Sequence, residues 1–123
     1  MPIRLFVCTL LMLLISGPVN AQRKLAFAGG GAGTCGQFAE AYRASPRVME
    51  DFYFSWAQGF MSGRNSVLLL QGNDQLIRDL ASLPIEEQQS FIRFHCNQFP
   101  LEPYVGAVIK LYNFLKQIDP NSN

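Results

Sequence analysis

The sequence predicts an all-α domain of four or five helices. Its apolar residues recur at spacings of three and four, and no segment shows a convincing run of period-two alternation. Proline, serine, threonine and glycine fall where such helices would begin and end. A chain of 123 residues has the size of one domain.

The amino terminus has the pattern of a secretory signal peptide, residues 1–21. Arg4 precedes an apolar run over 5–15, Gly17-Pro18 interrupts it, and Val19-Asn20-Ala21 forms a small-residue cleavage site. The run is about half of the roughly 20 residues that a transmembrane helix needs. No cysteine follows it that could carry a lipid. We therefore expect an exported protein with no stable membrane anchor after cleavage.

The charge balance argues against nucleic acid as a partner. Lysine and arginine number 10 against 9 aspartate and glutamate, and Arg4 would leave with the signal, so the mature charge is about zero. Such a chain has no basic field to capture a polyanion. No motif indicates a cofactor, and we expect none.

Two cysteines remain after processing, because Cys8 lies in the signal. Cys35 and Cys96 form an even pair in an exported chain, which favours a disulfide. Closing a loop of about 60 residues would contribute roughly 4 kcal/mol in the loop-entropy account. The competing interpretation is a metal site or a reactive thiol beside His95, but the spacing is not that of metal ligands. We favour the disulfide and expect no metal.

Residues 22–33 are expected to form a flexible Gly-rich leader. Four glycines between 29 and 33 disfavour both helix and strand. Residues 31–36 match GxGxxG literally, but no hydrophobic strand precedes them, so nucleotide binding is not supported. The folded helical domain is assigned to 34–118 and a tail to 119–123.

The first two helices have clear boundary signals. Thr34 and Gln37 form a capping-box pattern for a helix that ends near Ala44. Ser45 is a candidate N-cap for the second helix, with Pro46 at its first position and a stop by Gly72. The second helix is predicted to turn one apolar stripe toward the core, formed by Met49, Phe52, Trp56, Phe60, Gly63 and Val67.

Gly59 and Gly63 open one face of this long helix. The favoured interpretation is a second helix crossing there, and the alternative is a groove for a partner or ligand, with Trp56 and Phe60 beside it. Arg64 and Asn65 follow directly. They form either a solvated face, with Arg64 paired to a nearby acid, or a site where Asn65 bonds a loop backbone or Arg64 contacts a partner.

The carboxyl-terminal half predicts a short helix over 74–80 and another from about Pro84 to Cys96, with Ile85, Phe91, Ile92 and Phe94 inward. A final helix over about 103–117 has one polar stripe and is apolar elsewhere. We favour its being sandwiched within the domain over its being a protein-binding surface.

No catalytic arrangement is evident. His95 is expected to be a cap or a surface residue, the serines lack a GxSxG elbow, and the adjacent carboxylates 50–51 and 86–87 point apart on a helix. We therefore predict no enzymatic activity and no catalytic residues.

Two sets of residues carry a family resemblance that spans about residues 34–117. The Thr34-Cys35-x-x-Phe38 opening, a second cysteine ending a later helix and the final amphipathic helix resemble the HdeA/HdeB-like small periplasmic proteins. The pattern Trp56-x-x-Gly59-Phe60-x-x-Gly63-x-Asn65, with Cys96-x-x-x-Pro100, resembles the Tai-type immunity proteins of type VI secretion.

The resemblance implies a periplasmic helical bundle cross-linked by Cys35–Cys96, in a Gram-negative bacterium. An HdeA-like protein would be a stress chaperone of the holdase type, which dissociates in acid and holds denatured clients. A Tai-like protein would be a dimer that inhibits a secreted cell-wall-cleaving effector. Our leading hypothesis is a non-enzymatic exported protein that binds another protein in the HdeA-like manner, with the immunity role as the alternative and a homodimer left open. A small-ligand carrier with a groove at Trp56, Gly59 and Gly63 is the third hypothesis.

Overall fold

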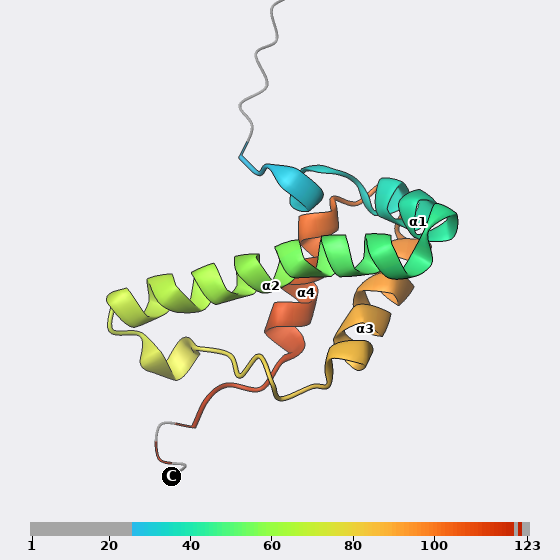
Figure 1. Ribbon diagram of the computed structural model, residues 1–123. Helices are drawn as coiled ribbons and strands as arrows, with labels where there is room; N and C mark the ends of the chain where they lie inside the picture. The colour runs from blue at the N-terminus through green and yellow to red at the C-terminus, as the bar shows by residue number, and fades with distance from the viewer. Residues whose placement is uncertain (1–25, 120, 122–123) are drawn as a thin grey trace, which may run out of the picture.

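The computed structural model describes residues 26–119 and residue 121. The predicted signal peptide, the leader residues 22–25 and tail positions 120, 122 and 123 lie outside the described residues. The elements are, in chain order, η1 (Gly29–Ala32), α1 (Cys35–Ala44), α2 (Pro46–Leu70), η2 (Asp74–Leu76), α3 (Ile85–Gln98) and α4 (Tyr104–Phe114) (Figure 1). The described part of the chain contains isolated β-bridges but no strand, so the all-α prediction is confirmed.

Helix α4 lies at the centre of the bundle. It contacts α1, α2, α3 and η1, and Figure 1 shows α2 crossing in front of it. Six of its eleven residues are buried: Tyr104, Val105, Ala107, Val108, Leu111 and Tyr112. Its broad apolar surface is therefore used inside the domain, as the sandwich interpretation predicted, although the final helix is shorter than expected.

The first helix boundary follows the sequence closely. The Thr34 hydroxyl accepts a hydrogen bond from the Gln37 amide at 3.2 Å, and the Gln37 side chain accepts one from the Thr34 amide at 2.8 Å. This is the predicted capping box. Helix α2 begins at Pro46, as expected, although the Ser45 side chain makes no capping bond. It ends at Leu70, and Gly72 adopts a left-handed φ of 71° that reverses the chain direction.

The predicted stripe of α2 is only partly inward. Trp56 and Phe60 are half-buried and pack against the core, but Phe52 and Val67 are more than half exposed. The fully buried residues of α2 are Phe54, Ala57 and Met61. Helix α2 has apolar residues on two sides, and both sets recur at helical spacing. The side with the small Ala57 and the flexible Met61 lies against the bundle.

The segment before α3 and α3 itself also depart from the expectation. The predicted helix over 74–80 is only the three-residue turn η2. In α3, Ile92 is buried and Phe91 is half-buried as predicted, but Ile85 and Phe94 are exposed. The inward positions are Gln88, Ile92, His95 and Cys96. The Cys96 cross-link and two hydrogen bonds from Gln88 to the Leu80 and Leu83 carbonyls set this rotation of α3.

The interpretation of residues 22–33 as a flexible leader is wrong for the part that the structure describes. The Trp56 indole donates a hydrogen bond to the Ala28 carbonyl at 2.7 Å, and Gly30 and Gly31 are buried. A Cβ atom added at Gly31 would lie 2.0 Å from the Trp56 ring. The glycines are needed here because the backbone lies directly on the indole face.

We predict opposite effects of alanine at two glycines. Gly31→Ala should lower the free energy of unfolding by about 1–3 kcal/mol, because the new methyl group collides with Trp56. Gly59→Ala should raise it by up to about 1 kcal/mol, because nothing lies within 4 Å of the new methyl and alanine favours the helix. Urea denaturation of the two variants measures both changes. A neutral Gly31→Ala would restore the linker interpretation.

Candidate functional site

An apolar groove runs along the second half of α2. It has a volume of about 620 Å³, and its lining residues are Gly59, Phe60, Gly63, Arg64, Val67 and Leu68. This half of α2 extends past the crossing with α4 toward η2 (Figure 1). The groove therefore lies beside the core rather than inside it.

The two glycines form the floor of the groove. No atom of a neighbouring element lies within 4 Å of a Cβ atom added at Gly59 or at Gly63, and both residues are exposed. The favoured expectation of a second helix crossing at these glycines is therefore wrong within the described chain. What the glycines provide is an open stretch of helix backbone between the side chains of Phe60 and Val67.

Arg64 is the only charge in this part of the chain. The sequence from Phe52 to Asn73 contains no other charged residue. The Arg64 guanidinium carbon lies 4.9 Å from the centre of the Tyr112 ring, in a cation–π contact. No ion pair to Arg64 occurs among the described residues, so the expected pairing with a nearby acid is not found.

Asn65 connects three elements. Its side-chain amide donates to the Arg78 carbonyl at 2.8 Å, and its side-chain oxygen accepts from the Arg78 amide at 3.1 Å. The same oxygen accepts from the Tyr112 hydroxyl at 2.7 Å. This is the loop-binding role that one of the sequence interpretations gave to Asn65. It fixes the far half of α2 to the loop after η2 and to α4.

Trp56 supports the groove without lining it. Its ring stacks on Phe60 with the ring centres 5.4 Å apart and the planes at 15°. Phe27 contacts the same phenylalanine from the amino-terminal segment, at 6.2 Å between ring centres. Phe60, one wall of the groove, is thus held between two aromatic rings.

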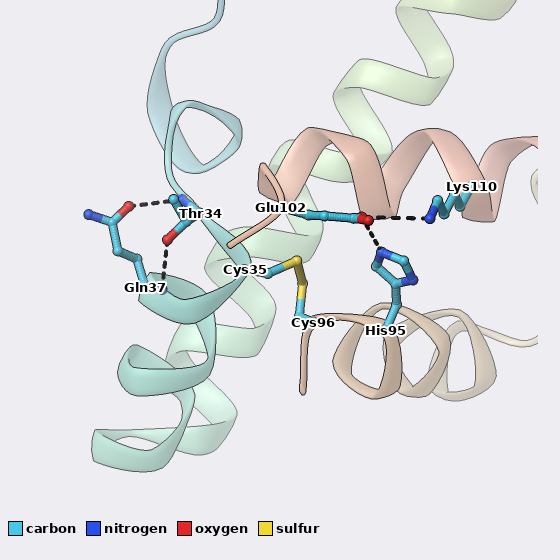
Figure 2. The surroundings of a disulfide bond; sticks show 7 residues. All are labelled: Thr34, Cys35, Gln37, His95, Cys96, Glu102 and Lys110. Carbon is cyan, nitrogen blue, oxygen red and sulfur yellow. Dashed lines mark hydrogen bonds and ion pairs between the residues drawn. A yellow bond between two sulfur atoms is a disulfide. The ribbon is translucent and has the colours of Figure 1, made fainter. Parts of the chain in front are cut away.

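A second polar cluster lies beside the disulfide (Figure 2). Cys35 and Cys96 are bonded, as predicted, with their Cα atoms 4.5 Å apart. Next to them, His95 Nε2 lies 2.7 Å from Glu102 Oε2, and Lys110 Nζ lies 3.6 Å from the same oxygen. The hydrogen bond with His95 lowers the pKa of Glu102 below its ordinary value of 4.5, and the positive charge of Lys110 acts in the same direction.

The sequence suggested that His95 is a cap or a surface residue; it lies in the last turn of α3, but it is not at the surface. It is 8% exposed, and its ring lies 4.8 Å from that of Phe99. The adjacent Cys96 cross-link turns this end of α3 inward, and Glu102 satisfies the imidazole there.

Sequence reasoning missed three residues that complete these clusters. Glu102 accepts from the Cys35 amide through its carbonyl as well as contacting His95 and Lys110 through its carboxylate. Arg78 contacts Asn65 and donates to the Leu115 carbonyl. Of the three, only Tyr112 could have been found from the sequence. A tyrosine in a buried apolar helix needs a hydrogen-bond acceptor for its hydroxyl.

Among the described residues, no group of three or more His, Cys, Asp or Glu side chains is placed so that it could hold a metal ion. Within residues 26–119, no helix combines the length and apolar content needed to cross a membrane. Compared with models of known families, with curated proteins and with solved structures, the chain matches none of them.

We predict that Asn65 contributes strongly to stability. Asn65→Ala should lower the free energy of unfolding by about 1–3 kcal/mol, because it leaves the Arg78 backbone and the Tyr112 hydroxyl without partners. Ser66→Ala is the matched control, since its hydroxyl bonds only within the exposed helix face, and it should change stability by less than about 0.5 kcal/mol. Equal effects of the two substitutions in urea denaturation would contradict this role.

The Glu102 cluster should make stability depend on pH. The lowered pKa of Glu102 means that its carboxylate stabilises the fold fully above about pH 4.5 and that this contribution is lost as the pH falls through the folded-state value. Glu102→Gln should therefore destabilise the protein at pH 7 and have a smaller effect at pH 3. Glu40→Gln, an exposed carboxylate on α1, controls for the loss of one negative charge. A Glu102→Gln effect that is the same at both pH values would refute the assignment.

Proposed function

We propose that this protein is a non-enzymatic exported protein that acts by binding another protein, in an HdeA-like holdase role. The observation that carries the proposal is the set of large apolar side chains that lie exposed on a disulfide-linked bundle. The most exposed are Leu101 at 93%, Leu70 at 89% and Phe94 at 66%. Val67, Leu69 and Leu70 lie exposed together at the end of α2, and contiguous exposed apolar surface is typical of surfaces that contact other proteins.

The disulfide supports an oxidising compartment for this activity. Disulfides persist in exported proteins and are rare in the reducing cytosol. Together with the amino-terminal pattern of residues 1–21, this favours the periplasm as the place where the protein acts.

The groove supports a protein partner better than a small ligand. All of its lining residues come from one helix, α2, so no second element closes it from the opposite side. Sites for small molecules bury about 70–90% of the ligand surface. An open groove of this kind fits an extended surface, so the small-ligand carrier is the weakest of the three hypotheses.

One carboxylate contact supports the acid response that a holdase role requires. Glu102 joins the loop before α4 to His95 on α3, and this hydrogen bond lowers the pKa of Glu102. Protonating Glu102 in acid removes attraction between these two elements. Loosening this contact would add exposed apolar surface when denatured clients are present.

One observation favours the immunity-type alternative. The loop that carries Leu101 is fixed by hydrogen bonds from the Cys35 amide to the Glu102 carbonyl and from the Gly36 amide to the Pro100 carbonyl, both 2.8 Å. A rigidly presented apolar side chain loses little entropy when it enters a partner's pocket. Tight binding to a single effector would use such an anchor.

The deciding experiment measures client aggregation with the oxidised, processed protein at pH 7 and near pH 2–3. We expect suppression of client aggregation in acid and binding of a hydrophobic dye, with little effect of Leu101→Ser because many apolar groups share the contact. A lack of suppression in acid would rule out the holdase role. If one stoichiometric partner is then captured, and Leu101→Ser abolishes its binding, the immunity-type role replaces it.

A further inference from the structure

Helix α2 has a second face that the bundle does not use. Its 25 residues make it about 37 Å long, and its fully buried residues are Phe54, Ala57 and Met61. The opposite side presents Phe52, Gly59, Gly63 and Leu70, all of them exposed. The groove runs along one edge of this face.

The chemistry of this face is unusual for a helix side in contact with water. Solvent-facing helix surfaces ordinarily carry charged residues. Here the stretch from Phe52 to Asn73 has a single charge, Arg64, and the exposed face itself presents glycine and apolar side chains, with uncharged serines and amides elsewhere in the stretch. A partner that covers this face removes water from few charged groups. The desolvation penalty of binding is therefore small.

The shape of the face suits another helix. Gly59 and Gly63 lie one turn apart and leave the backbone accessible, which allows close approach of a second backbone. Phe60 forms one wall, and the rings of Trp56 and Phe27 hold it in place. The groove is therefore shaped before any partner arrives.

Arg64 indicates the charge of the occupant. Its guanidinium is oriented over Tyr112 and is exposed, and it pairs with no carboxylate among residues 26–119. An occupant that carries a carboxylate opposite Arg64 would complete a charge-assisted hydrogen bond. A second copy of α2 suits this position poorly, because its only acids, Glu50 and Asp51, lie in its first two turns and its groove-lining part from Phe52 to Leu70 has none.

We propose that the α2 groove binds an amphipathic helix of another protein, with small and aliphatic residues facing Gly59 and Gly63 and one acidic residue facing Arg64. This inference rests on the proposed function and names its partner class. In this binding mode a helix lies in the groove, and side chains spaced three and four residues apart along that helix make the contacts.

The test uses a display library of helical peptides of about 18 residues, long enough to span the groove, selected on the processed, oxidised protein. We expect the selected peptides to share an acidic residue flanked by aliphatic ones. Binding should weaken about tenfold or more for Arg64→Glu and recover when the peptide acid is replaced by lysine. Gly63→Leu, which fills the groove, should weaken binding by at least as much.

Matched variants keep the result interpretable. Arg47→Glu reverses a charge on α2 away from the groove, and Gln58→Leu adds the same side chain as Gly63→Leu at an exposed position that does not line it. Both should bind the peptides normally. Gly59→Ala with Gly63→Ala should weaken binding while stabilising the fold, so that unfolding cannot explain the loss.

Three results would overturn the inference. The selected peptides could lack a shared acidic residue, or they could bind Gly63→Leu as tightly as the unaltered protein. Sedimentation could instead reveal a dimer that Gly63→Leu abolishes and the peptides do not displace. The last would make a second copy the occupant. If the groove selects no such peptides but the unaltered protein still suppresses client aggregation in acid, only the groove inference fails. If the unaltered protein binds no protein at all, the proposed function fails as well.

Discussion

The Cys35–Cys96 cross-link is the constraint on which the rest of this structure depends. Both cysteines are fully buried, and they join the start of α1 to the end of α3, 61 positions apart. Backbone hydrogen bonds from Cys35 to Glu102 and from Tyr104 to Gly33 reinforce the same junction. The entry to α4 is thereby fixed against α1, so the central helix enters the core in one orientation.

This arrangement leaves the two halves of α2 in different environments. The first half lies near the cross-linked end, where Glu50 pairs with Arg93 and the aromatic rings of Phe38 and Tyr53 are in contact. The second half extends away from it and is held through Asn65 to Arg78 and Tyr112. Exposed apolar surface can exist there because the polar contacts of Asn65 keep the helix in place without a hydrophobic cover.

Local signals in the sequence predicted local structure well. The Thr34–Gln37 capping box, Pro46 and Gly72 mark helix boundaries through interactions within a few residues. The cysteine pair was predicted from the even number of cysteines that follow the predicted signal peptide. The orientation of each helix was less predictable. Phe52 and Phe54 are equally apolar, and only the rest of the bundle decides which is buried. The role of residues 29–33 depended on a contact with Trp56 more than 20 positions away, which composition does not reveal.

The order in which the chain is made has a consequence for how this bundle forms. The Tyr104 amide bonds the Gly33 carbonyl, and the Ile118 amide bonds the Ile77 carbonyl, so residues near the end complete contacts with residues made much earlier. Such nonlocal closure slows folding relative to helical proteins whose neighbours in space are neighbours in sequence. Until synthesis reaches α4, the earlier helices lack their central partner, and the apolar side chains that will contact α4 stay exposed.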